Sequence, residues 1–545
     1  MTAMDWLLPH LPVLPVLLPA ATAMLLLLVG DHGGDRHATA ALRRNRRIAL
    51  VSVLLGAALA FANLFQADTG LLAVYRLGGW PAPFGIVLVV DRLSALMLVL
   101  VSLVALPVLL YASGGWDAHG RHFHALLQFQ LMGLNGAFVT GDLFNLFVFF
   151  EVLLIASYVL MVHGLGAQRL RVGLHYVVLN LVASSLFLIG VALIYALTGT
   201  LNLADLALRV RQVTGGEAAV LQVGALLLLV VFGFKAALAP LSLWLPGTYA
   251  AASPPIAALF AIMTKVGVYA IIRVHGVVFG AGAGESAMVA EPFLLPLALL
   301  TTIWGVLGAL AAHSLTRLVA WLTVASVGTI VAALGLYGES AWAAALYYLA
   351  HSTLVMAGLF MLAELVGAQR GEAGDRLAPA PPVVQPTLLG SLLLLSAASG
   401  AGLPPLPGFI GKVMVLQASA GHAWAVAVWA VVLGAGFFTL VGLARAGSIL
   451  FWQAHHEGHA SGAPSGASPR LLAATVSLII ASLALSVLAQ PVARYTRDAA
   501  AQLADRDAYA NAVLGEHGGP AAQTTRPYTG ERPPPGPAKT QGDKP

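Results

Sequence analysis

The chain has 545 residues, of which 59% are hydrophobic and only 9% are charged, and its formal net charge is +5. Soluble domains carry about 25% charged residues, so this composition excludes an ordinary soluble fold and indicates a polytopic helical membrane protein. The chain has no cysteine, which excludes disulfides, thiolate metal sites and iron–sulfur clusters. It has no basic stripe with interleaved aromatic residues, so nucleic acid is not an expected partner.

Long apolar runs recur along the chain, each close to the roughly 20 residues that cross a bilayer as a helix. They predict an all-α membrane protein with about 14 transmembrane helices. The first run begins near Leu11, has no basic segment before it and is too long for a signal peptide, so we count it as a span. The expected spans are 11–30, 48–66, 85–111, 125–141, 143–163, 173–197, 221–246, 255–279, 291–312, 318–336, 341–363, 385–418, 422–448 and 471–490.

Two segments lack this apolar character. The stretch HHEGHASGAPSGASPR, which begins at His455, is expected to be a loop before the last span. Its histidines could bind a metal ion, but a solvated loop is the favoured interpretation, so no metal site is expected. Residues 491–545 are expected to form an extracytoplasmic tail, and the composition after about residue 515 is typical of a disordered chain.

The arginines predict the orientation, because cytoplasmic loops are enriched in basic residues. With the N-terminus outside, 13 arginines lie in inner connections and five in outer ones, if the tail is excluded. Both termini are therefore expected to be extracytoplasmic. The inner set is Arg36, Arg43, Arg44, Arg46, Arg47, Arg121, Arg169, Arg171, Arg317, Arg370, Arg376, Arg445 and Arg470, and the outer set is Arg76, Arg92, Arg209, Arg211 and Arg273.

One glutamate and three lysines lie well inside apolar runs: Glu151, Lys235, Lys265 and Lys412. A carboxylate at the bilayer centre costs about 2.5–3.5 kcal/mol on insertion scales, and such residues usually mark ion pathways. Every basic residue in the loops is arginine, so lysine is a specific choice within the spans. A buried lysine can lose its proton and arginine cannot, which favours titration over a fixed ion pair. The structural alternative, a side chain that extends to the membrane interface, fits Lys265 best.

Two spans also contain helix-breaking prolines, Pro240 in the seventh span and Pro404, Pro405 and Pro407 in the twelfth. Backbone freed by proline inside a bilayer is tolerated where it lines protein or a water-filled cavity. Transporters use such broken helices at ion sites, often once in each inverted repeat. The separation of the breaks predicts two inverted five-helix repeats, spans 4–8 and 9–13, each with a broken fourth helix.

This pattern predicts the organisation of the chain in five parts. The expected parts are the N-terminal spans 1–3 (1–124), the first five-helix repeat (125–280), the second five-helix repeat (281–448), an inner loop with span 14 (449–490) and the tail (491–545).

Other polar residues allow two interpretations each. His351 in span 11 is either a satisfied core residue or a proton carrier, because histidine titrates near neutral pH. Thr323, Ser326 and Thr329 share one face of span 10, where helix packing is favoured over a water-lined path. Asp91, at the start of span 3, is interpreted as an anchor at the membrane interface.

Four longer stretches of the sequence resemble one protein family. They are GDLFNLFVFFEVLLIASYVL, TGTLNLADL, FGFKAALAPLSLWLPGTYAAASPPIAALFAIMTKVGVYAIIR and GLPPLPGFIGKVMVLQA, and they cover spans 4–8 and 12 in order. The chain resembles the antiporter-like subunits shared by respiratory complex I, membrane-bound hydrogenases and Mrp-type multisubunit cation/proton antiporters. Val355 and Met356 stand where many relatives carry a lysine, and the stretch HSTLVMAGLF and the length are most similar to the D subunit of Mrp systems, the PhaD or MnhD type.

The resemblance implies an ion transporter subunit without a cofactor, not an enzyme, that exchanges protons for Na⁺ or K⁺ across the bacterial inner membrane. It implies that protons pass along Glu151, Lys235, Lys265, His351 and Lys412, with Glu151 paired electrostatically to Lys235. The implied partners are the other subunits of a hetero-oligomeric Mrp-type complex and the lipid bilayer. The alternative is a proton-pumping subunit of a redox complex, of the NADH dehydrogenase or membrane-bound hydrogenase kind.

Overall fold

The structure is a computed structural model that describes residues 8–30, 38–453 and 466–515. Most of the expected loop after span 13 and the tail after residue 515 lie outside the described residues. Each of the expected spans coincides with a helical segment. The first six are α2 (Leu14–Val29), α3 (Ala38–Asp68), α4 (Arg92–Ala112), α5 (Phe123–Val139), α6 (Leu143–Met161) and α7 (Ala167–Thr198).

The remaining spans include two that are built from two helices each. The seventh to eleventh are α9 (Gly215–Ala236) with α10 (Trp244–Ala251), α11 (Pro254–Ile271), α12 (Glu291–Leu310), α13 (Leu315–Gly335) and α14 (Glu339–Gly367). The last three are α15 (Pro386–Ala401) with α16 (Pro407–Ala418), α17 (Ala425–Gly447) and α18 (Pro469–Val487). Within the described ranges, 11 helical segments are long and apolar enough to cross a membrane, and α2 and α15 are shorter apolar helices.

Smaller elements connect these helices. Strands β1 (Ala73–Arg76) and β2 (Val87–Val90) form an antiparallel hairpin before α4, with Ala73 opposite Val90. The short helix α8 (Leu203–Arg209) follows α7, and α11 continues as the π-helical segment η6 (Ile272–Val278). Two further helices end the described chain, α19 (Ala489–Ala504) and α20 (Arg506–Leu514).

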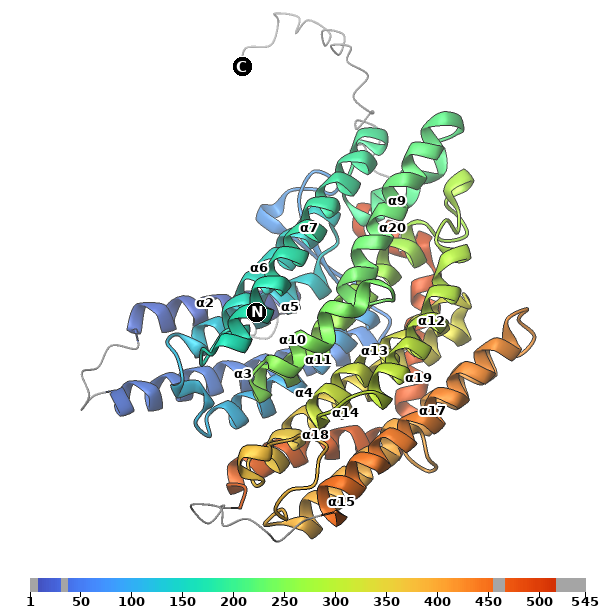
Figure 1. The fold of residues 1–545 in the computed structure, drawn as a ribbon. Coiled ribbons are helices and arrows are strands. Elements are labelled where there is room, and N and C mark those ends of the chain that lie inside the picture. Colours follow the sequence, from blue (N-terminus) through green and yellow to red (C-terminus); the bar gives the residue numbers. More distant parts are fainter. Residues whose placement is uncertain (1–7, 31–37, 454–465, 516–545) are drawn as a thin grey trace, which may run out of the picture.

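The helices differ strongly in how far their neighbours bury them. The apolar window is 100% buried in the segment that contains α11, 94% in α13 and α14, and 83% in α4, but only 28% in α3 and α18 and 39% in α7. These central helices therefore form the core of the bundle, and the outer ones leave apolar side chains for the surroundings (Figure 1). A helix that is apolar on all sides and exposed on one is expected in a bilayer.

Both predicted breaks are present. The helix α9 ends before Ala237, which has a positive φ of 63°, and helical structure resumes only after Pro240. The helix α15 ends before Gly402, whose φ of 88° suits a residue without a side chain, and α16 begins at Pro407. The two breaks place loop backbone inside the bundle, where its polar groups need partners.

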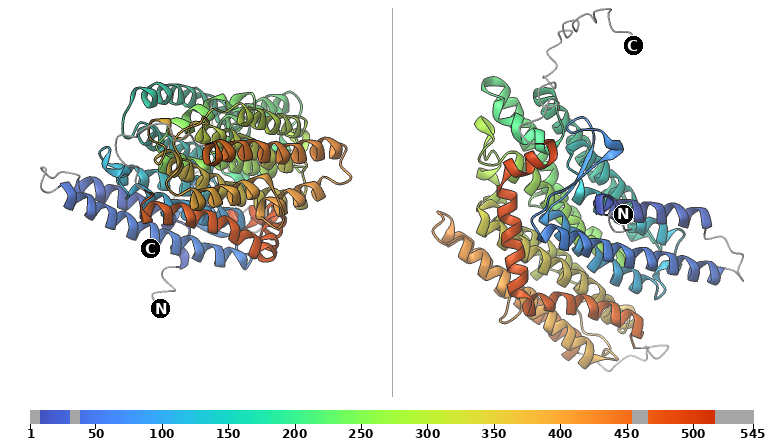
Figure 2. Two further views of the ribbon diagram at one scale, coloured as in Figure 1. Left: turned by 60° about the horizontal axis from the view of Figure 1, so that its bottom comes forward. Right: turned by 180° about the vertical axis from the view of Figure 1, so that it is seen from behind.

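The helix α19 was not expected from the hydropathy of the sequence. It turns away from α18 and runs across the ends of neighbouring spans instead of along them (Figure 2, right). It packs against α14 and α4. Its charged residues are too frequent for a span, and an amphipathic helix of this kind is typical of a membrane surface.

An ion-pair cluster joins α3 to α5 at the opposite end of the bundle. The Arg46 guanidinium donates two hydrogen bonds to Asp117, both at 2.7 Å, and His124 Nε2 lies 3.0 Å from the same carboxylate. Burial alone would raise the pKa of Asp117, but the hydrogen bonds from Arg46 and His124 lower it to about 2. The carboxylate is therefore charged at neutral pH and holds these two helices together.

Candidate functional site

Lys235 lies in the last turn of α9, directly before the break. Its side chain is buried, and Nζ donates a hydrogen bond to Asn180 Oδ1 of α7 at 2.9 Å. The rings of Phe150 and Phe234 each lie 5.9 Å from Nζ. A neutral amide and two aromatic faces therefore surround this amine, so its charge has no carboxylate in direct contact.

Glu151 lies in the middle of α6, as the sequence predicted, but it does not touch Lys235. Its carboxylate accepts a hydrogen bond from the hydroxyl of Ser184, which stands on α7 one turn after Asn180. The charge of Glu151 still acts on Lys235 through space. The expected electrostatic pairing thus involves no contact ion pair, and each of the two residues bonds its own polar partner on α7.

Lys265 is completely buried in α11, and its Nζ has no hydrogen-bond partner among the residues that the structure describes. Burial rules out the alternative that this side chain extends to the membrane interface. The backbones of α11 and α9 approach closely beside it: a Cβ on Gly267 would lie 2.5 Å from the amide nitrogen of Ala236. The absence of a side chain at Gly267 thus brings the helices of Lys235 and Lys265 together.

His351 is buried in α14 and faces the second break. Its Nδ1 lies 3.2 Å from Ser482 Oγ of α18. A Cβ on Gly408 of α16 would lie 2.8 Å from Nε2, so the imidazole lies against the start of α16.

Lys412 is held by the broken helix itself. Its Nζ donates to the carbonyl of Ala401 at 2.6 Å and to that of Gly400 at 3.3 Å, the last carbonyls of α15. A helix C-terminus carries partial negative charge and carbonyls without an intrahelical partner. The break thus supplies acceptors for a buried ammonium, which agrees with the predicted role of Pro404 and Pro405.

The first break has a different arrangement. Its freed backbone is satisfied by neighbours, because Ala239 N donates to Thr301 Oγ1 at 2.9 Å and Trp244 Nε1 donates to the Phe234 carbonyl at 3.1 Å. Lys235 precedes this break, whereas Lys412 follows the other one, so the two lysines do not occupy equivalent places around their breaks.

The five titratable residues lie on a continuous row of packed helices. In order along the row, α6 with Glu151 packs on α7, and α7 packs on α9 with Lys235. The helix α9 packs on α11 with Lys265, α11 on α14 with His351, and α14 on α16 with Lys412. The row crosses from the first predicted repeat into the second. Packing of consecutive helices is the arrangement that a relay of protons through the bundle requires.

The three hydroxyl residues of α13 do not join this row. Thr323, Ser326 and Thr329 each donate to a carbonyl of their own helix, at 3.0, 2.8 and 3.2 Å. All three are buried. Their bonds agree with the interpretation that these small residues serve helix packing.

Two cavities with charged residues in their walls open at opposite ends of α11. One, of about 630 Å³, is lined by Pro254 and Ala257 of α11 and by Arg169, Glu364 and Asp375. The other, of about 550 Å³, is lined by Gly276 and Gly280 in and after η6 and by Arg211, Glu339, Asp505 and Arg506. Each cavity is large enough to hold several water molecules, so it could bring protons toward the buried row.

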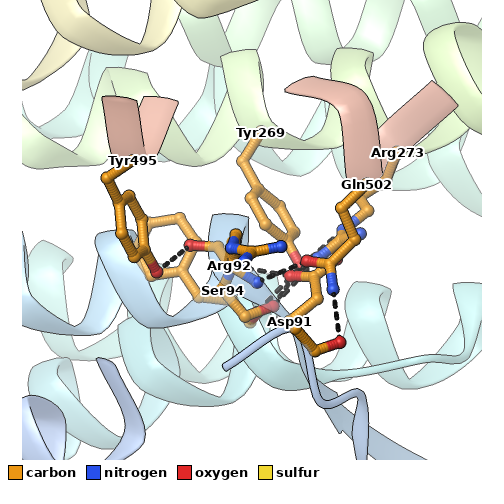
Figure 3. A network of polar contacts seen from close by, with 9 residues as sticks. Asp91, Arg92, Ser94, Tyr269, Arg273, Tyr495 and Gln502 are labelled. Carbon is orange, nitrogen blue, oxygen red and sulfur yellow. Dashed lines mark hydrogen bonds and ion pairs between the residues drawn. The ribbon is translucent and has the colours of Figure 1, made fainter. Parts of the chain in front are cut away.

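Sequence reasoning missed a buried ion pair beside this row (Figure 3). The carboxylate of Asp91 accepts two hydrogen bonds from the Arg273 guanidinium, both at 2.6 Å, and Asp91 is not the interface anchor that we expected. Arg273 also donates to the hydroxyls of Tyr269 and Ser94, both at 2.9 Å. A lone acid at the start of a span gave no indication of a partner 182 positions away.

Helix α19 closes this network from outside the bundle. Gln502 Oε1 accepts from the amide of Arg92 at 2.9 Å, and the Tyr495 hydroxyl donates to the carbonyl of the same residue, also at 2.9 Å. These contacts hold α19 against the start of α4, next to the acid that binds Arg273.

Comparisons with known proteins agree with one another. Residues 140–439 match the family described as "NADH:quinone oxidoreductase/Mrp antiporter, TM". The D subunit of a probable K(+)/H(+) antiporter of Rhizobium meliloti (strain 1021) is 40% identical over 535 residues, which cover 92% of this chain and 96% of the relative. The D subunit of the Na(+)/H(+) antiporter of Alkalihalophilus pseudofirmus is 37% identical over 513 residues, with 93% and 100% covered. A chain in the Mrp complex from Dietzia sp. DQ12-45-1b superimposes with a TM-score of 0.81 at 28% identity, over 93% of this chain and 99% of that one.

Proposed function

This chain belongs to the family of Mrp antiporter D subunits, and we propose that it moves protons in exchange for Na⁺ or K⁺ as one subunit of a hetero-oligomeric complex in the bacterial cell membrane. Its relatives are transporter subunits and not enzymes. The observation that carries the proposal is the row of Glu151, Lys235, Lys265, His351 and Lys412 on successive packed helices.

The proposed mechanism passes protons along this row. Each of the three lysines is buried, and within the described residues its amine bonds an amide, two carbonyls or no group at all, so each can exchange a proton with water or with a neighbouring group at modest cost. Glu151 acts as the electrostatic switch: its charge favours a proton on Lys235, and loss of that charge releases the proton toward Lys265. Asn180 and Ser184 hold the acid and the base at a constant separation during this change.

The two cavities supply the proposed ends of the route. With the orientation that the arginines predict, the cavity with Glu364 and Asp375 faces the cytoplasm and the cavity beside η6 faces the outside. Asp375 is held by Thr316, whose amide and hydroxyl donate to it at 2.8 and 2.6 Å. Glu364 stands on the helix of His351, so it is placed to pass protons between the inner cavity and that helix.

The division of the chain remains part of this proposal. We assign residues 125–280 and 281–448 to two inverted five-helix repeats, with both termini outside. The pair of broken helices, α9 with α10 and α15 with α16, supports this division. The alternative function, a proton-pumping subunit of a redox complex, is not favoured because the curated relatives are antiporter subunits.

The test is the exchange activity of Glu151 variants in the assembled complex. Glu151→Gln keeps the shape and loses the charge, so we expect normal assembly and loss of proton-driven Na⁺ and K⁺ exchange in everted vesicles. Glu151→Asp is expected to retain part of the activity. Glu217→Gln, at the exposed start of α9, is the matched control and is expected to behave as wild type. Wild-type exchange in Glu151→Gln would refute the switch.

A further inference from the structure

An apolar groove lies on the side of the bundle where α3, α4, α14, α18 and α19 meet. We call it the α3–α18 groove, and its volume is about 530 Å³. Its walls are almost entirely hydrocarbon. The apolar side chains that line it include Phe61, Phe65, Leu100, Leu354, Leu485 and Val492. Phe65 and Leu488 are 70% and 50% exposed, so the groove is open to the surroundings of the bundle.

Polar groups occur at one end of the groove only. They are Asp68 at the end of α3 and Arg494 and Tyr495 of α19. The hydroxyl of Tyr495 is engaged with the Arg92 carbonyl. Within the described part of the chain, Arg494 makes a single polar contact, of 3.4 Å with Asp68, and its side chain is 64% exposed. Most of the five N–H donors of this guanidinium are therefore available to a ligand.

The position and size of the groove fit one chain of a lipid. The groove lies beside the last turns of α3 and α18 and the first turns of α4. It therefore lies within one half of the membrane thickness. An apolar cavity of about 150 Å³ holds one benzene molecule, so the groove has room for on the order of 20 carbon atoms. A transmembrane helix is far larger than this, because a helix with its side chains is about 10–12 Å across.

The floor of the groove adjoins the proposed proton row. Ala350 and Leu354 line the groove and flank His351 on α14. Ala481 lines it as well, and the next residue, Ser482, is the one whose hydroxyl contacts His351. A hydrocarbon chain in the groove would thus complete the apolar layer between the surroundings and the imidazole.

We propose that the α3–α18 groove is a binding site for a membrane phospholipid. One acyl chain lies in the groove against α14, and the phosphate of the headgroup accepts hydrogen bonds from Arg494. Arginine suits this task because its planar guanidinium matches the geometry of phosphate oxygens. The bound lipid thickens the apolar layer beside His351, which the protein already buries.

The experiment uses the full complex in nanodiscs that contain phosphatidylethanolamine and phosphatidylglycerol, with a small fraction of phosphatidylglycerol that carries a photoreactive diazirine on one acyl chain. After illumination, peptides with attached lipid are identified by mass spectrometry. We expect labelling of the parts of α3, α4 and α18 that line the groove. Ala484→Phe fills the groove and is expected to abolish this labelling. The matched control is Ile480→Phe, on an exposed part of the same helix that does not line the groove.

A second pair of variants tests the headgroup without changing the interior. A basic residue near anionic lipid contributes about 1 kcal/mol, so Arg494→Glu is expected to lower labelling at a limiting amount of the probe by about fivefold. Arg497→Glu makes the same change of charge one turn away, outside the groove, and is expected to label as wild type.

Equal labelling of wild type and Ala484→Phe would overturn the proposal, and so would wild-type labelling of Arg494→Glu. A third result would also overturn it: absence of labelling in the intact complex, together with cross-links from a cysteine at Phe65 to another subunit. That outcome would show that the groove is an interface with a protein.

Discussion

Glu151 and Lys235 are each hydrogen-bonded to a different residue of α7, Ser184 for the acid and Asn180 for the lysine. The two α7 residues are four positions apart, so their side chains lie on one face. The acid and the base therefore interact through space without forming a contact ion pair. A contact pair inside a membrane would be difficult to open, whereas this arrangement lets the charge of either residue change with little movement.

Asn180→Leu removes the only hydrogen-bond acceptor that the described structure gives to Lys235. We expect the complex to assemble and its exchange rate to fall by about tenfold or more, because an unpaired buried amine costs about 1–3 kcal/mol. The measurement is cation exchange driven by a pH gradient in everted vesicles, normalised to the amount of complex. The matched control is Ser185→Ala on the exposed side of α7, where the hydroxyl bonds only its own helix. If Asn180→Leu exchanges like wild type, α7 does not position Lys235.

Lys265→Met separates stability from activity. The amine of Lys265 is buried without a partner, so its replacement by an apolar side chain of similar length removes a cost of about 1–3 kcal/mol. We expect a higher melting temperature of the subunit and a loss of exchange. Lys412→Met should lose exchange but lower the melting temperature, because it leaves the carbonyls of Gly400 and Ala401 without a donor. A lower melting temperature for Lys265→Met would mean that water or another group satisfies this amine.

Lys412→Arg distinguishes a proton carrier from a fixed charge. Arginine can still donate to the Ala401 carbonyl, but it cannot release its proton. We therefore expect Lys412→Arg to be nearly as inactive as Lys412→Ala, while the complex still assembles. The assay is the same vesicle exchange, with Na⁺ and K⁺ tested separately. Exchange by the arginine variant close to that of wild type would remove Lys412 from the proton route and leave it as a charge that shapes the route.

The Asp91–Arg273 pair is expected to be a structural requirement. Asp91→Leu leaves a buried guanidinium without its carboxylate, which costs about 3–5 kcal/mol, so we expect poor assembly. The double variant Asp91→Leu with Arg273→Met removes both charges and should recover most of the assembled complex. The measurement is the yield and melting temperature of the complex in both variants. If the single and double variants are equally unstable, the charges do not act as a pair.

The topology can be tested by cysteine labelling, because the chain has no native cysteine. A cysteine in place of Ala40, at the exposed start of α3, is expected to lie in the cytoplasm. An impermeant maleimide should label it only in everted vesicles, and a cysteine at Asp507 should show the opposite behaviour. Labelling of the Ala40 variant from outside intact cells would reverse the proposed orientation, and with it the assignment of the two cavities.

The spans, the two breaks and the charged residues within the membrane could be predicted from the sequence. The bilayer requires about 20 apolar residues for each crossing and makes every intramembrane charge costly, so each feature is visible in one short stretch. The helix α19 could also have been found, because Val492, Tyr495, Ala499 and Leu503 recur at helical spacing. It was missed because hydropathy identifies spans and not amphipathic helices.

The partners of those charges were decided only by the tertiary structure. Nothing in the stretch around Asn180 shows that its amide meets Lys235, 55 positions later, or that Ser184 meets Glu151. The same holds for Asp91 and Arg273 and for the carbonyls that hold Lys412. Local hydropathy determines which segments enter the membrane, but the faces that meet depend on how the helices pack. Packing depends on the shapes of all neighbours at once, including small residues such as Gly267 that let two backbones approach.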